Sequence, residues 1–221
     1  MPDTTRLLIR KDGLGIYLSH LDLMHNMERV FNRAQVRIWH TQGFNPHPYM
    51  SFCLPLSLGV ASECEIMDFK MEQQIPLEEL PGRLNPFMPA GITVLEAYTS
   101  PRKTRELSWL EIGGELFYDD GTAREKLPLL QELFARESIV IERKTKRGVG
   151  PSDIASGIRE LTFAAPDDGT VTLRGVIAAQ NPGLNPAHLI AAIRQLEPAL
   201  TPDFHRFRRL EVYDDNMNVF R

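Results

Sequence analysis

The feature that most constrains the fold of this chain is an order of secondary-structure signals that occurs twice. The first half carries strand-like segments at residues 6–11, 36–40, 65–72 and 92–98, and helical patterns at residues 21–34 and 77–85. The second half carries strand-like segments at residues 108–118, 139–146, 170–178 and 206–213, and helical patterns at residues 122–136 and 185–196. Each half therefore reads β-α-β-β-α-β, an order in which both helices can cover one face of an antiparallel sheet.

Helix 21–34 is the strongest of these signals. Its apolar side chains recur at steps of three and four residues along one stripe: Met24, Met27, Phe31 and Ala34. We predict an α+β fold of two tandem ferredoxin-like units with antiparallel sheets, residues 1–103 and residues 104–221. A single continuous α+β domain is the alternative, because the halves share an element order and no visible sequence identity.

The composition is that of a globular protein, with 43% hydrophobic and 24% charged residues. No apolar run approaches the roughly 20 residues that span a bilayer, and the first residues lack a secretory signal pattern. We therefore expect a cytoplasmic protein with no membrane association. A net charge of −4 argues against a protein that coats nucleic acid without sequence preference.

The chain has two cysteines, Cys53 and Cys64, which do not form a CxxC pair. They are too few for a disulfide framework or for a zinc or iron–sulfur site made of four thiolates. Nothing around either cysteine indicates an activated thiolate. We predict no cofactor and no metal.

Polar side chains concentrate between residues 17 and 65. Four of the six histidines lie there: His20, His25, His40 and His47. Buried polar groups need hydrogen-bond partners, so core packing explains such a density poorly. The segment is therefore typical of a recognition or active site.

The helix in this segment has a clear start. Ser19 and Asp22 form the S-x-x-D pattern of a capping box. His20 lies on the apolar stripe, so a hydrogen-bonded core histidine is the alternative to a binding role. A polar ridge follows at spacings of three and four: Asp22, His25, Arg29 and Arg33. An ordinary exposed helix face would present the same spacing.

The loop over residues 41–48 reads TQGFNPHP. Its glycine can take positive φ and its prolines fix φ, so we expect a rigid loop, which loses little entropy when it binds a ligand. We predict that it folds back over the ridge, so that both line one cleft. The predicted substrate- or partner-binding residues are Ser19, His20, Asp22, His25, Arg29, Arg33, Gln42, Phe44, Asn45 and His47.

Metal binding is a weaker interpretation of the same residues. His20 and His25 are five positions apart, about 140° around a helix, so they point to different faces. The HExxH zinc motif works because its histidines are four apart and share a face, and that spacing is missing here.

A second candidate site is basic. Four cations fall within five residues and could contact phosphate or RNA: Arg143, Lys144, Lys146 and Arg147. Solvated surface cations would give the same pattern, since exposed Lys and Arg are common.

The chain resembles the radical-SAM-linked domain family of unknown function. The matching residues are Ser19 to Met24, Glu28, Arg29, Arg33, Ala34, Thr41 to Pro48, Leu56, Gly59, Ser62, Glu65, Leu84, Asn85, Pro89, Gly91, Glu142, Arg143, Thr145, Lys146, Gly148, Asp153 and Ile154. The resemblance covers nearly the whole chain, and the SHLDLM and TQGFNPHP segments are highly specific. The family usually has an arginine in place of His25 and often another in place of Asn32.

Members of that family are encoded beside, or fused behind, radical SAM enzymes that carry a cobalamin-binding domain. The resemblance implies a partner rather than a reaction, because the three closely spaced thiolates of a radical SAM cluster are missing here. The leading hypothesis is a non-catalytic accessory or substrate-binding protein that works with a separate radical SAM enzyme in RNA or ribosome-related modification.

Two other functions stay open. An RNA-binding or RNA-processing protein could use a histidine as general base, by analogy with the tandem ferredoxin-like units of CRISPR RNA endonucleases. A metal-dependent enzyme would need His20, Asp22, His25 and His47 to converge.

Overall fold

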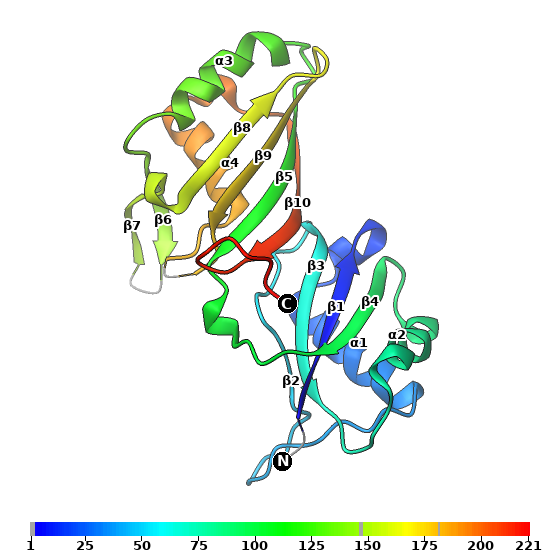
Figure 1. Ribbon diagram of the computed structural model, residues 1–221. Helices are drawn as coiled ribbons and strands as arrows, with labels where there is room; N and C mark the ends of the chain where they lie inside the picture. The colour runs from blue at the N-terminus through cyan, green and yellow to red at the C-terminus, as the bar shows by residue number, and fades with distance from the viewer. Residues whose placement is uncertain (1–2, 146–147, 181) are drawn as a thin grey trace. The chain divides into compact units, whose positions relative to one another are not determined.

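The computed structural model describes residues 3–145, 148–180 and 182–221 (Figure 1). The chain divides into two units, Met1–Glu106 together with Arg221, and Leu107–Phe220. Both units combine an antiparallel sheet with two helices, so the fold is mixed α+β.

The first unit contains the strands β1 (Thr4–Lys11), β2 (Met50–Phe52), β3 (Ala61–Lys70) and β4 (Ile92–Thr99). They lie in the order β4-β1-β3-β2, and each neighbouring pair is antiparallel. The helices are α1 (His20–Arg33) and the short α2 (Leu80–Leu84). Four 3₁₀ turns accompany them: η1 (Gly13–Tyr17), η2 (Leu77–Glu79), η3 (Asn85–Phe87) and η4 (Thr104–Glu106).

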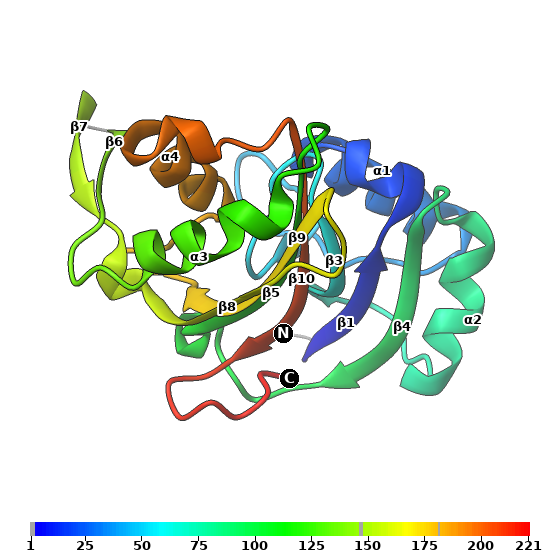
Figure 2. The same cartoon turned by 90° about the horizontal axis from the view of Figure 1, so that it is seen from above.

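Both helices of the first unit pack on one face of its sheet (Figure 2), because their apolar residues share a core with alternate strand residues. The buried members include Leu23, Met27 and Phe31 from α1, and Leu80 and Leu84 from α2. The ring of Phe31 lies 4.8 Å from that of Phe69 on β3. Each such side chain contributes about 1.5–3 kcal/mol through burial. The predicted helix over residues 21–34 is confirmed.

The capping box at the start of α1 is also confirmed. The Ser19 hydroxyl accepts a hydrogen bond from the Asp22 amide at 3.1 Å, and the Asp22 carboxylate accepts from the Ser19 amide at 3.4 Å. The helix ends after Arg33, where Gln35 takes a positive φ of 56°. Two local signals therefore fix the length of α1.

The predicted strand over residues 36–40 is wrong. Only single bridges form there, between Ile38 and Met71 and between His40 and Pro48, and β2 lies further along the chain, after the predicted loop over residues 41–48. The amide of Trp39 bonds the carbonyl of Lys70 at 2.9 Å before the chain leaves the edge of β3. The chain returns to this edge at Tyr49. The turn between Trp39 and Tyr49 therefore interrupts what would otherwise be one edge strand.

The second unit contains β5 (Trp109–Phe117), β8 (Ile158–Ala164), β9 (Thr170–Ala178) and β10 (Phe204–Tyr213). Their order is β10-β5-β9-β8, again antiparallel throughout. The helices α3 (Ala123–Phe134) and α4 (Pro186–Leu196) lie on the same side of this sheet (Figure 2). Two 3₁₀ turns complete the unit: η5 (Ala155–Gly157) and η6 (Pro198–Leu200).

The predicted strand over residues 139–146 does not belong to this sheet. The corresponding element β6 (Val140–Thr145) pairs only with β7 (Gly148–Asp153) in a separate two-stranded ladder. The side-chain amide of Gln195 on α4 accepts from the Glu142 amide and donates to the Glu142 carbonyl, which holds β6 beside the helix. The edge strand β8 lies instead between residues 146 and 170, where no strand was predicted, and none of its residues is buried. Among the described residues, no helix is long and apolar enough to cross a membrane.

Candidate functional site

The polar ridge of α1 faces solvent. Asp22, His25, Arg29 and Arg33 are all exposed, whereas Leu23 on the opposite side is buried. Two hydrogen bonds from Ser19, through its hydroxyl and its amide, lower the pKa of the Asp22 carboxyl. Asp22 is therefore a carboxylate at neutral pH, at the positive end of the helix dipole.

His20 takes a different direction from the ridge. Its ring meets the ring of Phe52 on β2 edge-on, with centroids 5.8 Å apart, and it is only partly exposed. The structure thus places His20 and His25 on different sides of the helix. Of the predicted binding residues on α1, His20 is the one that contacts the sheet layer.

The loop over residues 41–48 closes on itself. The Thr41 amide bonds the His47 carbonyl at 2.9 Å, the His47 amide bonds the Thr41 hydroxyl at 3.2 Å, and that hydroxyl lies 3.0 Å from His47 Nδ1. Gln42, Phe44 and Asn45 are exposed, and Phe44 is fully so. Among the described residues, no hydrogen bond or ion pair joins this loop to the ridge of α1. The convergence of the two on one cleft therefore has no support from polar contacts.

A buried polar layer lies below the start of α1. Lys11, Ser62 and Glu65 are each at most 1% exposed, which is unusual for charged side chains. The Lys11 ammonium donates to the carbonyl of Leu18 at 2.9 Å. Glu65 lies directly opposite Ile9 in the β1–β3 ladder, so its side chain shares the helix-facing side of the sheet with Ile9. Sequence reasoning missed Lys11. The signal was its alternation with Leu7 and Ile9.

Large apolar side chains are exposed to solvent around the start of α1. Leu14, Tyr17, Leu21 and Leu58 are 64–71% exposed, and we name these four the Leu21 patch. Leu14 and Tyr17 are three residues apart in η1, so they share one face. The Gly59 amide bonds the Ile16 carbonyl at 2.9 Å, which brings the loop of Leu58 onto η1. Leu21 stands in the first turn of α1. Exposed apolar side chains gathered in one region mark interaction sites.

The sheet face of the first unit that lies opposite the helices holds a buried ion pair. The guanidinium of Arg6 is 2% exposed and bonds both carboxylate oxygens of Asp68, at 2.7 and 3.0 Å. It also bonds the Ser100 hydroxyl at 3.1 Å and the Arg102 carbonyl at 3.0 Å, which fastens the segment after β4. Cys53 contacts Asp68 and Thr104 there, and burial raises the pKa of its thiol to about 11. This cluster is structural, since a protonated thiol is a poor nucleophile.

The basic group of the second unit is only partly described. Arg143 and Lys144 lie on β6, while Lys146 and Arg147 fall outside the described residues. Burial, and then the charge of Arg143, lower the pKa of His188 in the first turn of α4. Arg143 therefore lies near that helix start.

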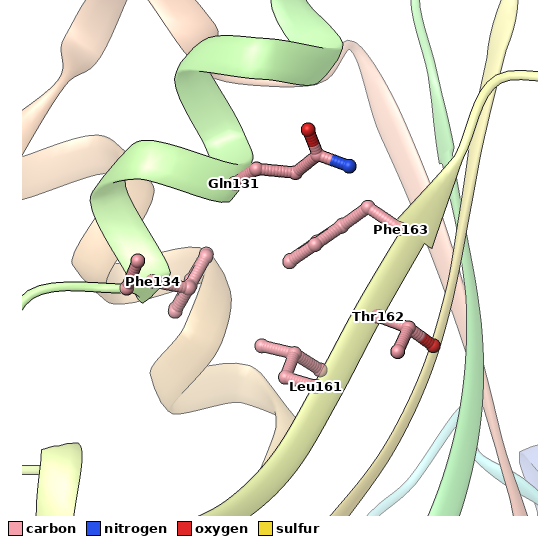
Figure 3. Close-up of a pocket in the computed structure, with 6 residues that line it drawn as sticks. Gln131, Phe134, Leu161, Thr162 and Phe163 are labelled. Carbon is pink, nitrogen blue, oxygen red and sulfur yellow. The ribbon is translucent and has the colours of Figure 1, made fainter.

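A hollow of about 310 Å³ opens between α3 and β8 (Figure 3). Gln131 and Thr162 line it together with apolar side chains, and the rings of Phe134 and Phe163 stack there with centroids 5.5 Å apart. Among the residues with described positions, no three His, Cys, Asp or Glu side chains gather closely enough to hold a metal ion.

Residues 5–186 match a family model described as "Uncharacterized protein conserved in bacteria (DUF2344)". The chain belongs to this family. A search of curated proteins finds no match.

Solved structures add a likeness of fold. A chain in the crystal structure of a Cbf5-Nop10-Gar1 complex superposes with a TM-score of 0.51 and 9% sequence identity over 94% of this chain, which spans only 48% of that one. An unknown protein from Galdieria sulphuraria gives a TM-score of 0.27 and 11% identity, with 95% of this chain and 99% of that chain covered.

Proposed function

We propose that this protein is a non-catalytic accessory subunit that binds a separate enzyme through the Leu21 patch. The observation that carries this proposal is the exposure of four large apolar side chains around the start of one helix. Solvent exposure of so much apolar surface is unfavourable, and burial against a partner would recover about 25 cal/mol per Å². We therefore propose that a partner protein binds the Leu21 patch.

The residues behind the radical-SAM-linked resemblance support this location. Leu21 itself belongs to the SHLDLM segment, and Gly59 connects the loop of Leu58 to η1. Ser62 and Glu65 form the buried layer below. Part of the resemblance therefore lies at the patch or directly below it, which favours a radical SAM enzyme as the partner. The Asp22 carboxylate at the rim of the patch favours a partner surface with Lys or Arg around an apolar centre.

We also infer that each unit is of the ferredoxin-like type. The strand orders β4-β1-β3-β2 and β10-β5-β9-β8 both correspond to fourth, first, third and second strand, once β6 and β7 are set aside as an insertion. Such folds carry many functions, so this inference gives the scaffold and not the activity.

Co-purification tests the proposal. Tagged full-length protein should recover the radical SAM enzyme encoded in the same genome, and adding it should change that enzyme's turnover. Tyr17→Glu or Leu21→Glu should weaken binding at least tenfold, because a charge would be buried in the interface. Leu129→Glu is the matched control, since Leu129 is a 49% exposed leucine on α3 of the other unit.

Two results would overturn the proposal. One is that no such enzyme is recovered and its turnover stays the same. The other is that Leu129→Glu weakens binding as much as Leu21→Glu does, which would locate the interface elsewhere. Circular dichroism of each variant excludes unfolding as the cause.

RNA binding is a second candidate function. The stacked rings of Phe117 and Phe204 beside Arg206, on the sheet of the second unit, favour it. Arg143 and Lys144 remain proposed anion contacts. Cleavage by a histidine base is less supported, because His25 and His47 make no polar contact with each other among the described residues.

A further inference from the structure

The side chains of β5 alternate between the two faces of the second unit's sheet. Leu110, Ile112 and Leu116 are buried on the side of the helices. The residues between them point to the opposite side, which we name the open face: Trp109, Glu111, Gly113, Glu115 and Phe117. Their cross-strand neighbours on β10 and β9 share that face: Phe204, Arg206, Arg208, Glu211, Tyr213, Thr170, Thr172, Arg174, Val176 and Ala178.

One end of the open face presents an aromatic pair. The rings of Phe117 and Phe204 stack with centroids 5.9 Å apart and an interplanar angle of 29°. Phe204 is 59% exposed, so one of its faces is available to solvent. The guanidinium of Arg206 lies 4.9 Å from the Phe117 centroid. This end can therefore take another flat ring beside a fixed positive charge.

The other end of β5 repeats the combination. The guanidinium of Arg159 lies 5.3 Å from the ring centroid of Trp109. Trp109 and Phe117 are eight residues apart on one strand, which corresponds to about 27 Å at about 3.4 Å per residue. Phe117 and Trp109 thus lie at the two ends of β5, and we name them the aromatic platforms. The surface of the open face between them is named the track.

Both charges occur along the track, with Glu211 opposite Glu111, and in two ion pairs the arginine is more exposed than its carboxylate partner. Arg174 pairs with Glu111, whose side chain is 13% exposed while that of Arg174 is 69% exposed. Tyr213 also donates to the Glu111 carboxylate, at 2.6 Å. Arg206 pairs with Glu115 at 3.2 Å, with 58% of the arginine and 45% of the glutamate side chain exposed. At these two pairs, a ligand approaching the face meets a guanidinium group first.

We infer that the open face of the second unit binds single-stranded nucleic acid. Bases would stack on Phe204 and on Trp109, and the phosphates would meet Arg159, Arg174 and Arg206. Unpaired strands fit this chemistry because their bases are free to leave the stack, whereas a duplex hides its base faces. The inference deepens the RNA-binding candidate and is independent of the accessory role, since it rests on a different surface in a different unit.

RNA and single-stranded DNA share the chemistry that this face recognises. Fluorescence anisotropy with full-length protein would compare labelled RNA, DNA of the same sequence and the corresponding duplex, each of about 10 nucleotides, a length within known site sizes. Tighter binding of RNA than DNA would point to contacts with the 2′-hydroxyl. Equal binding would point to stacking and phosphates alone.

Variants locate the site. Phe204→Ala should weaken binding about 5- to 150-fold, the range measured for loss of one stacked base. Its control is Phe87→Ala, because Phe87 is a 39% exposed phenylalanine of the first unit. Arg174→Gln and Arg206→Gln should each reduce the salt slope by about 0.7, the contribution of one phosphate on a single strand. Arg124→Gln on α3 is their control, since it also pairs with an exposed carboxylate.

The inference is overturned if neither single strand binds, if the duplex binds as tightly as the single strands, or if Phe87→Ala weakens binding as much as Phe204→Ala. Loss of this binding while partner capture through the Leu21 patch persists would support the inference and separate it from the proposed accessory function.

Discussion

The ion pair between Arg6 and Asp68 should be one of the most sensitive points of the first unit. Asp68→Ala removes two charge-assisted hydrogen bonds, each worth about 1.5–3 kcal/mol, and leaves a 2% exposed guanidinium without its counter-charge. Breaking one partner out of a buried pair typically costs about 3–5 kcal/mol. We therefore expect the free energy of unfolding of this unit to fall by about 3–5 kcal/mol.

Urea denaturation measures this loss. The chain has two tryptophans, one in each unit, so a Trp109→Phe background leaves Trp39 as the fluorescent reporter of the first unit. The matched control is Arg83→Ala, because Arg83 and Glu79 form a similar two-bond ion pair about half exposed on α2. That change should cost less than about 1 kcal/mol.

A second variant separates the charge from the packing. Leucine at both positions removes the ion pair together, and such replacements are often neutral or stabilising. Arg6→Leu with Asp68→Leu should therefore be more stable than Asp68→Ala alone. A loss below about 1 kcal/mol in Asp68→Ala, or a double variant as unstable as the single one, would refute the reasoning.

Three other predictions follow from single contacts. Gly91→Ala should cost roughly 2–4 kcal/mol in urea denaturation, because Gly91 has a φ of 82° and an added Cβ would lie 2.1 Å from the Asp12 carbonyl; Gly82→Ala, with open space around it, should be neutral or stabilising. At pH 8, both thiols should react with Ellman's reagent only after unfolding, since burial raises the pKa of Cys53 to about 11 and Cys64 is buried; rapid labelling of the native protein would contradict this. Burial also raises the pKa of Tyr118 to about 12, so stability should be complete below pH 10 and fall as pH rises toward 12, less steeply in Tyr118→Phe; an unchanged slope in that variant would argue against Tyr118 as the source.

Local signals made much of the fold predictable. The helix α1 followed from its apolar spacing and from Ser19 and Asp22, because capping and periodicity act within a few residues. The strands β1, β3, β4, β5, β9 and β10 were predicted from apolar or alternating segments. These strands carry buried residues, and burial requires apolar side chains at those positions. Their sequences therefore show the pattern that predicts a strand.

The edge strands were harder to predict. The strand β8 has one neighbour and few buried residues, so its sequence resembles that of an exposed loop. The segment over residues 36–40 has the right alternation, yet the turn between Trp39 and Tyr49 moves the paired strand to Met50–Phe52. Pairing of an edge strand depends on backbone groups far away in the sequence. The residues of the strand itself do not reveal these partners.

The candidate site was predictable only in part. The histidine-rich segment contains Tyr17, Leu21 and Leu58 of the Leu21 patch, but these residues and Leu14 looked like ordinary apolar positions. Their exposure depends on how η1 and the loop before β3 meet at Gly59. The open face of the second unit required the register of β5, β9 and β10, because its aromatic and arginine residues are far apart in the sequence.

The shielding of both native cysteines has a practical consequence for work on this protein. A thiol introduced at an exposed position such as Glu125 or Gln42 should react with maleimide dyes or spin labels far faster than Cys53 or Cys64. Pairs of such labels, one in each unit, would report distances between the units in solution as ligands are added.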